Sequence, residues 1–383
     1  MKLAAMKLSE ANHAPLSWAT LLAPLSAMYE TIVRVRAALY SRGIFKVERL
    51  TGAIVISVGN LTTGGTGKTP LVAVVARLAG EELRAMHRAK TGNDLAALRI
   101  CVLSRGYGRR EPQRRVVVSD GRQLLADAAT GGDEPRELAE RLQGIAAVIS
   151  DRDRAAAARW AQQHLGTRVF LLDDGFQHLR LARDLDIVTV DATQPFGGGH
   201  LLPRGRLREP VTALRRANLI VITRAEQVAL ETMRHLAHAL QKLSREGTTV
   251  LICRTQIINA LPLHSQHSTH DSFHALTTNA LAFCALGNPD SFFSLLRQNG
   301  YQLTHTIAFD DHHNYQQQDA ASIEHAAREC GAQVLITTAK DAVKLRELSW
   351  TLAVYIIEID AVIDEGEQVL RGALRERLAR LQV

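Results

Sequence analysis

The sequence predicts an α/β protein, with a main domain built on a parallel sheet, a second and smaller α/β domain, and an N-terminal helix. Short apolar runs alternate with helical stretches along most of the chain, the pattern of parallel strands joined by crossover helices. The first apolar run, residues 54–58, leads directly into a glycine-rich turn that ends in Gly67-Lys68-Thr69. Strand, turn and helix in this order indicate a P-loop NTPase-type sheet domain. We place the three parts at residues 1–45, 46–258 and 259–383.

The glycine-rich turn has the composition of a phosphate cradle. Backbone N–H groups can converge on phosphate oxygens only where bulky side chains are absent, and the following helix adds its positive N-terminal dipole. Lys68 is then expected at the β- and γ-phosphates and the Thr69 hydroxyl at Mg²⁺. The predicted nucleotide-binding residues are Thr62, Thr63, Gly64, Gly65, Thr66, Gly67, Lys68 and Thr69. Thr62 stands where the usual motif has its first glycine, and a glycine-rich turn without a ligand is the alternative.

Composition limits the possible partners. The 383 residues are 46% hydrophobic and 22% charged, which is enough for a large core in a globular protein. A formal charge of +7 favours an anionic partner: a nucleotide, a phospholipid surface, a phosphorylated substrate or a nucleic acid. Aromatic residues make up only 5% of the chain and do not interleave with the arginines, so we expect no nucleic acid partner. Nothing in the sequence indicates an obligatory protein partner.

The N-terminal region predicts a helix at a membrane surface. No residue from Ala14 to Tyr29 is charged, but Pro15 and Pro24 interrupt the stretch and it is too short to span a bilayer. An interfacial helix with its arginines at anionic headgroups fits the pattern, and an ordinary helix packed on the domain fits it as well.

Two strand ends of the main domain carry polar groups. The apolar run at residues 99–104 is followed by Arg105 and Tyr107, and ligands of open α/β sheets bind at such carboxyl ends. We therefore expect Arg105 and Tyr107 to contact substrate, although a tight basic turn is the alternative. Further along, Asp133 precedes a helical pattern. It could cap that helix, or it could act as a general base or metal ligand.

The apolar run at residues 169–174 ends in two carboxylates, Asp173 and Asp174. P-loop proteins hold Mg²⁺ with an acidic residue at the end of a buried strand, so both are candidate metal ligands. Gln177 and His178 follow at once and are expected near the same site as substrate-binding residues.

A long loop rich in glycine and proline, residues 194–210, lies between apolar runs at residues 186–190 and 218–223. It has no apolar periodicity and is too long for a plain connector, which favours a binding loop. Arg204, Arg206 and Arg208 offer phosphate contacts, with Arg204 and Arg206 as the predicted substrate-binding residues. Glu209 offers a further carboxylate for the metal.

The sequence becomes polar and histidine-rich at residues 257–278, which we interpret as the junction to the smaller domain. Its histidines lack the spacing of a known metal site and are expected to be solvated. The smaller domain is expected to contain strands at residues 281–287, 334–338 and 352–359 and helices at 290–298, 320–329 and from about 365. A polar cluster, FDDHHNY, occupies residues 309–315.

Seven motifs together resemble one family. In chain order they are SVGNLTTGGTGKTP, LSRGYGR, GDEP, LLDDGFQH, GGGHLLPRGRLREP, FDDHHNY and TTAKDAVK, spread from about residue 50 to residue 345. This succession closely resembles the tetraacyldisaccharide 4′-kinases, inner-membrane kinases of lipid A synthesis. Two departures are visible: Ala339 stands where the family usually has Glu, and residues 80–98 look like an unusual insertion.

The resemblance implies that ATP phosphorylates the 4′-hydroxyl of an acylated disaccharide 1-phosphate at the cytoplasmic face of the bacterial inner membrane. It assigns Asp133 and His312 as the base pair acting on that hydroxyl, in preference to His313. Lys68 and the loop amides would hold ATP, while Thr69, Asp173, Asp174 and Glu209 would hold Mg²⁺. A base pair shared between two domains would make catalysis depend on domain closure. The alternative hypothesis is a membrane-associated P-loop ATPase switch with no sugar acceptor.

Overall fold

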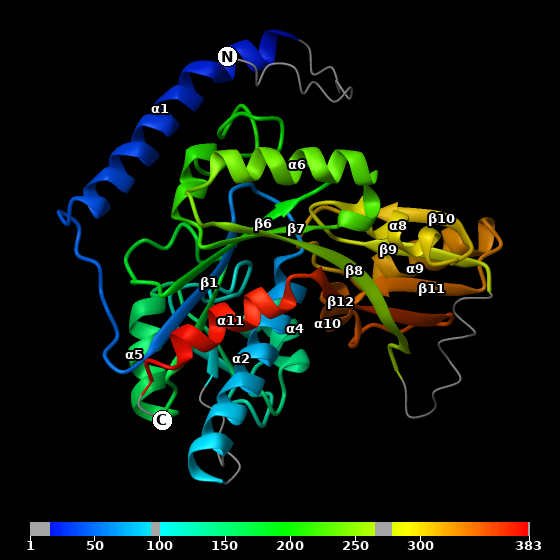
Figure 1. Cartoon of the computed structure of the whole chain (residues 1–383). Helices are drawn as coiled ribbons and strands as arrows, with labels where there is room; N and C mark the ends of the chain where they lie inside the picture. The colour runs from blue at the N-terminus through cyan, green and yellow to red at the C-terminus, as the bar shows by residue number, and fades with distance from the viewer. Residues whose placement is uncertain (1–15, 93–99, 265–277, 382–383) are drawn as a thin grey trace.

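The computed structural model describes residues 16–92, 100–264 and 278–381, and within them it shows an α/β protein with one mixed, mostly parallel sheet (Figure 1). The strand order is β10-β9-β11-β12-β8-β7-β6-β1-β5-β2-β4-β3. All neighbouring strands are parallel except β3 with β4 and β8 with β12. The predicted α/β class is confirmed, with a single mixed and mostly parallel sheet.

The large lobe contains strands β1 to β7 with the helices that cover them. Its strands are β1 (Ile54–Asn60), β2 (Ile100–Ser104), β3 (Val116–Ser119), β4 (Ala147–Ser150), β5 (Val169–Asp173), β6 (Leu185–Asp191) and β7 (Leu219–Thr223). Its α-helices are α2 (Lys68–Thr91), α3 (Ala128–Gly131), α4 (Asp133–Arg141), α5 (Arg154–His164), α6 (Leu230–Leu243) and the C-terminal α11 (Glu367–Leu378). The short 3₁₀ turns η2 (Val211–Arg216) and η3 (Ala225–Gln227) flank β7.

Helices cover both faces of this half of the sheet, which explains why its central strands are apolar throughout. All seven residues of β1 are buried, as are those of β6 and β7. Successive β1 side chains enter opposite cores: Ile54 and Ile56 pack with α2, α4 and α11, whereas Val55 packs with α5. The position of the carboxyl end of β1 is thereby fixed by the helices packed on both faces of the sheet.

The small lobe repeats this arrangement on a smaller scale. It contains β9 (Ala280–Cys284), α8 (Pro289–Gln298), β10 (Leu303–Ala308), α9 (Gln317–Glu329), β11 (Val334–Thr338) and α10 (Ala339–Leu345). Alternate β9 side chains pack against α8 on one face and against α9 and α10 on the other.

A ribbon of two long antiparallel strands, β8 (Thr249–Pro262) and β12 (Ala353–Glu365), joins the lobes. β8 pairs with β7 only as far as Ile252, and its remaining residues continue roughly 30 Å beyond the large lobe at about 3.3 Å per residue. The small lobe is attached to that extension, because β11 pairs with the first residues of β12. Its strands run in the opposite direction to those of the large lobe, so the carboxyl edges of the two lobes face each other.

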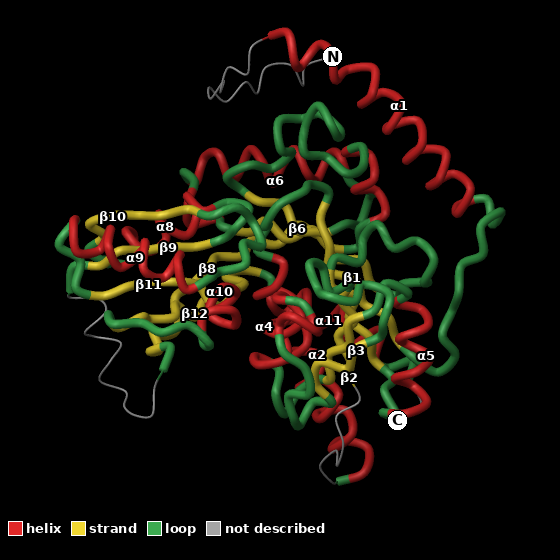
Figure 2. Tube along the Cα trace, turned by 180° about the vertical axis from the view of Figure 1, so that it is seen from behind, coloured by secondary structure: helices red, strands yellow, loops and turns green. Residues whose placement is uncertain are grey.

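Helix α1 (Leu16–Ser41) lies outside the sheet and its covering helices in both views (Figures 1 and 2). Three hydrogen bonds attach it to the large lobe: Ser26 Oγ to the Leu201 carbonyl, Tyr29 Oη to the Arg208 carbonyl, and Arg36 Nη2 to the Gln177 carbonyl. No helix in the described ranges has the length and apolar character that a bilayer crossing requires.

Two expectations about individual elements were wrong. Residues 80–91 of the expected insertion at 80–98 are helical, because α2 continues without interruption to Thr91. The continuation is stabilised from outside, since buried Glu82 pairs with Arg371 and Arg375 of α11. The expected junction at residues 257–278 begins with strand, because β8 continues to Pro262.

The expected boundary at residues 258/259 therefore lies inside β8, and α11 packs on the large lobe. The expectation for solvated histidines is met by exposed His264. His267, His270 and His274 lie outside the described residues, as do residues 93–98 of the expected insertion.

Candidate active site

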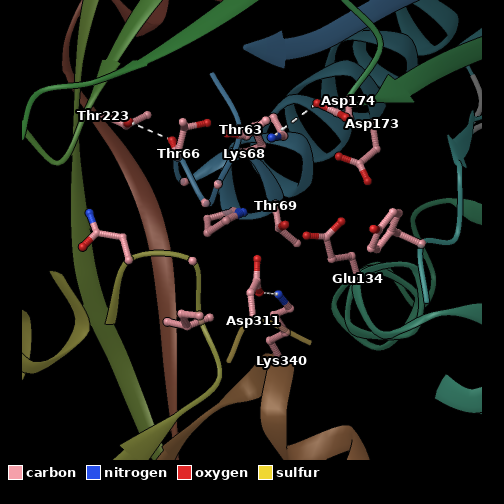
Figure 3. Close-up of a pocket in the computed structure, with 18 of the residues that line it drawn as sticks. Thr63, Thr66, Lys68, Thr69, Glu134, Asp173, Asp174, Thr223, Asp311 and Lys340 are labelled. Atoms are coloured by element: carbon pink, nitrogen blue, oxygen red, sulfur yellow. Dashed lines mark hydrogen bonds and ion pairs between the residues drawn. The ribbon is translucent and has the colours of Figure 1, made fainter. Parts of the chain in front are cut away.

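A cavity of about 860 Å³ lies between the facing edges of the two lobes. It is lined by the glycine-rich turn, the ends of β2 and β5, the start of α4, the β8–β12 ribbon and the small-lobe loops after β9, β10 and β11. Figure 3 shows side chains from both lobes pointing into it. Any ligand in this cavity would contact both lobes.

The turn between β1 and α2 is held from beneath by a buried polar network. Asn60 Nδ2 donates to Thr66 Oγ1 at 3.0 Å, and the Thr223 hydroxyl donates to the Thr66 carbonyl at 2.9 Å. Gly64 and Gly67 adopt φ angles of 100° and 71°, at which a residue with a side chain would be strained. The path of the turn is therefore fixed by hydrogen bonds and by glycine at these two positions.

The loop at residues 194–210 supports this turn along its edge. Thr63 N donates to the Arg206 carbonyl and Arg208 N donates to the Leu61 carbonyl, both at 2.7 Å. Buried Leu207 anchors the segment between these two bonds. The loop thus acts as a short added strand that fixes the first part of the glycine-rich turn.

Lys68 projects into the cavity and has two partners. Its Nζ lies 3.2 Å from Asn60 Oδ1 and 3.3 Å from Asp174 Oδ1. Thr69 lines the same cavity, and Figure 3 shows it beside Lys68 and facing Glu134. The ammonium and the hydroxyl are both available to an anionic ligand with a bound cation.

The carboxyl end of β5 presents two carboxylates in different electrostatic surroundings. Burial, with the charges of Glu134 and Asp174, raises the pKa of Asp173 to about 7. Burial also acts to raise the pKa of Asp174, but Lys68 and Arg208 outweigh it and hold that pKa well below its usual range. Asp174 is fixed by a 2.6 Å hydrogen bond from Arg208 Nη1. The two carboxylates therefore differ: Asp174 is ionised and paired with Lys68 and Arg208, whereas burial favours the protonated form of Asp173.

His312 reaches the cavity from the opposite lobe. It follows β10, has a φ of 64°, and places Nδ1 3.3 Å from Asp133 Oδ2 at the start of α4. The imidazole lines the cavity, whereas the Asp133 side chain lies behind it and is 14% exposed. The Tyr107 ring lies 5.3 Å from the imidazole. His313 instead pairs with Asp319 at 3.1 Å and does not line the cavity.

Comparisons with known proteins match this architecture along nearly its whole length. The family model described as tetraacyldisaccharide-1-P 4′-kinase matches residues 18–379. The chain belongs to this family. Its function is that of a tetraacyldisaccharide 4′-kinase, a phosphotransferase of lipid A biosynthesis. The family assignment favours the kinase over an ATPase switch without a sugar acceptor.

Curated relatives in the kinase family agree. The chain is 44% identical over 326 residues to a tetraacyldisaccharide 4′-kinase of Geobacter metallireducens, covering 85% of this chain and 88% of the relative. It is 39% identical over 358 residues to one of Anaeromyxobacter sp. (strain K), covering 92% and 89%. The crystal structure of the "apo" form of LpxK from Aquifex aeolicus in complex with ATP superposes with a TM-score of 0.71 at 27% identity, covering 96% of this chain and all of the other.

Most of the sequence-predicted residues of the kinase meet at this cavity. Arg105, Tyr107, Gln177 and His178 line it together with the glycine-rich turn and the Asp173–Asp174 pair. Burial, with the charge of Arg154, lowers the pKa of His178 to about 4, and the His178 Nε2 atom is buried without a hydrogen-bond partner. His178 is therefore a neutral imidazole with a free ring nitrogen.

Besides Asp133, four predicted residues do not line the cavity. Thr62 is buried. Glu209 does not line the cavity and is held by both terminal nitrogens of Arg216, at 2.7 and 3.0 Å. Arg206 contacts Gln194 behind the glycine-rich turn, and Arg204 is exposed outside the cavity. Arg208, two residues further on, is the arginine of this loop that lines the cavity.

The sequence analysis missed several cavity residues of the kinase. Glu134 has a signal, since it directly follows Asp133 in the first turn of α4. Lys340 at the start of α10 and Asp311 in the loop after β10 form an ion pair at 2.8 Å, inside motifs that the resemblance had identified. Tyr29 and Arg36 of α1 line the cavity without any local sequence signal.

Proposed function

We propose that this kinase transfers the γ-phosphate of ATP to the 4′-hydroxyl of its acylated disaccharide 1-phosphate, with Lys68 and the glycine-rich turn holding the phosphates and His312 accepting the hydroxyl proton. The observation that carries the proposal is that the His312 imidazole faces the glycine-rich turn across one cavity. Phosphoryl transfer needs a held phosphate and an oriented hydroxyl whose proton has an acceptor. Each lobe supplies one of these requirements.

Asp133 serves His312 rather than the substrate in this proposal. A carboxylate accepting from Nδ1 fixes the tautomer in which Nε2 is the free acceptor, and it stabilises the imidazolium that forms on proton transfer. Burial acts to raise the pKa of Asp133, but hydrogen bonds from His312 and Lys344 lower it below its usual value. Asp133 therefore stays ionised. Its negative charge stabilises His312 most strongly once the imidazole has accepted the proton.

The residues at the end of β5 fit Mg²⁺. Mg²⁺ is commonly held by one or two carboxylates together with substrate phosphates and water, and no preformed cluster of three ligating His, Cys, Asp or Glu side chains is found within the described residues. Asp174 Oδ1 is buried and accepts no hydrogen bond, although Lys68 Nζ lies 3.3 Å from it, and Asp173 and Thr69 line the same cavity. These three residues would hold the ion, which when bound neutralises charge on the phosphates.

The two ends of the cavity suit the two substrates. Leu286, Phe292, Leu295, Ile357 and Ile359 form an apolar wall beside the ribbon, which suits the flat face of a nucleobase. Arg105, Tyr107, Gln177, His178 and Arg208 form a polar and basic wall near α1, which suits a sugar phosphate. The sugar would then lie between His312 and the base of α1.

The outer face of α1 supports attachment to the cytoplasmic face of the inner membrane. Leu25, Met28, Ile32 and Val35 are each about half exposed, and their spacing places them along one side of the helix. A row of exposed large apolar side chains is costly in water and is stabilised at a lipid interface. The same helix lines the cavity through Tyr29 and Arg36, which places the substrate site next to the lipid surface.

A radiolabelled-ATP transfer assay tests the proposal. The enzyme is offered the tetraacyl disaccharide 1-phosphate, the deacylated sugar phosphate, or buffer alone, each with detergent micelles. We expect label in the acylated product and little ATP hydrolysis without acceptor. Rapid ATP hydrolysis that does not depend on acceptor, with no labelled lipid, would contradict it.

A further inference from the structure

Helix α10 of the small lobe extends a lysine to the Asp133 carboxylate. Lys344 Nζ lies 2.5 Å from Asp133 Oδ2 and donates to the His313 carbonyl at 2.9 Å. Its side chain is only 10% exposed, so the ammonium is largely removed from water. An ammonium that is buried to this extent needs a partner charge, and Asp133 provides it.

Lys344 and His312 contact the same oxygen atom. His312 Nδ1 lies 3.3 Å from Asp133 Oδ2, the atom that Lys344 contacts. A carboxylate on a short side chain can rotate, and a second donor from a fixed direction removes that freedom. The loop carrying His312 is fixed to the same lysine, since Lys344 also bonds the backbone of the next residue, His313.

We propose that Lys344 is a positioning residue for the proton transfer: it holds Asp133 Oδ2 and the His312 loop in register, and it does so only when the small lobe contacts α4. The inference rests on the proposed role of the Asp133–His312 pair. Lys344 does not line the cavity, so it acts through these two residues and not on the substrate.

A second ion pair across the same interface provides a matched control. Arg346, two residues after Lys344, bonds both carboxylate oxygens of Glu140 at 2.9 and 3.0 Å. This pair also joins α10 to α4, but neither residue lines the cavity or contacts the dyad. If lobe contact alone mattered, losing the Arg346 pair would have the same effect as losing the Lys344 pair.

The test compares Lys344→Met, Lys344→Arg and Arg346→Met in the full-length enzyme by labelled-phosphate transfer, with kcat and the KM of each substrate measured separately. We expect Lys344→Met to lower kcat roughly 10- to 100-fold with little change in KM for ATP, the scale of a small misplacement of a catalytic group. Lys344→Arg should restore most of the loss, and Arg346→Met should keep kcat near the wild-type value. Lys344→Gln, which keeps a donor but not the charge, replaces the methionine variant if that protein does not fold.

A double-variant experiment separates this inference from the proposed dyad. In a His312→Ala enzyme, Lys344→Met should add little to the loss, because its effect passes through His312. An equal loss in Arg346→Met, a change confined to KM, or an additive loss in the His312→Ala background would each overturn the positioning role. A His312→Ala enzyme with normal kcat would instead overturn the proposed dyad itself.

Discussion

Replacing Asp133 or His312 separates proton transfer from ATP binding. With the His312 Nδ1–Asp133 Oδ2 distance of 3.3 Å and an effective dielectric constant of 20, an imidazolium is stabilised by about 5 kcal/mol. At about 1.4 kcal/mol per tenfold change, this sets an upper bound between three and four orders of magnitude in rate. Lys344 offsets part of the Asp133 charge, so the measured loss should be smaller. We expect Asp133→Asn and His312→Ala each to lower kcat by roughly two to three orders of magnitude, within the range of general acid–base catalysis.

Single-turnover transfer of labelled phosphate at saturating ATP, with ATP affinity measured separately, provides the assay. ATP affinity should change little, because neither residue is part of the glycine-rich turn. The double variant should be scarcely slower than either single variant, since both residues serve one proton transfer. Losses that add cleanly would refute the dyad. Thermal unfolding of Asp133→Asn is the necessary control, because this change also removes the partner charge of Lys344.

Three further predictions follow from the same structure. Lys68→Ala and Thr69→Ala should each abolish transfer in a folded protein, because Lys68 is the proposed positive charge on the phosphates and Thr69 the proposed metal ligand; near-normal turnover of either in the transfer assay would refute the P-loop assignment. Ile32→Glu with Val35→Glu should shift the protein from vesicles to solution in a flotation assay while ATP binding survives, and unchanged flotation would place the anchor on another surface. The His178 imidazole, with its pKa lowered to about 4, is neutral in the folded state and protonated below about pH 6.5 in the unfolded chain, so the folded state loses stability as pH falls between these values. Between pH 7 and pH 5, the free energy of unfolding measured by chemical denaturation should fall by up to about 2 kcal/mol less in His178→Asn than in the wild type. An equal fall in both proteins would contradict the buried neutral imidazole.

The parts of the site that could be predicted from sequence are those built at the end of a single strand. β1 and β5 are neighbours in the sheet and both end at the same edge, so local pattern alone brings the glycine-rich turn to Asp173 and Asp174. The Asp133–His312 pair has no local pattern, because its two residues come from different lobes and are 179 positions apart. Only the family resemblance suggested that contact.

The wrong placement of the loop residues Arg206 and Glu209 has a physical cause, the alternation of side-chain direction along an extended chain. Along residues 206–209 successive side chains point in different directions, so Leu207 enters the core, Arg208 reaches Asp174, and Glu209 meets Arg216. Composition identified a basic loop but not which arginine faces the cavity. Strand β8 was missed for a related reason, although its partner β12 was expected at residues 352–359. Much of β8 beyond β7 alternates between exposed and partly buried residues, so it lacks the apolar run that predicts a buried strand.

Two residues of this site have a strained backbone conformation. Asp174 and His312 are two of the three residues other than glycine with positive φ in the described chain, and both face the cavity. Such a conformation costs about 1 to 3 kcal/mol and persists only when the surroundings over-determine it. Asp174 is held by Lys68 and Arg208, which belong to its own lobe, so its geometry survives any lobe separation. His312 is paired across the interface with Asp133, and Lys344 of its own lobe contacts both Asp133 and the backbone of His313. We therefore propose that the Asp133–His312 pair forms only when the lobes close, which would limit transfer to the state in which both substrates lie between the lobes.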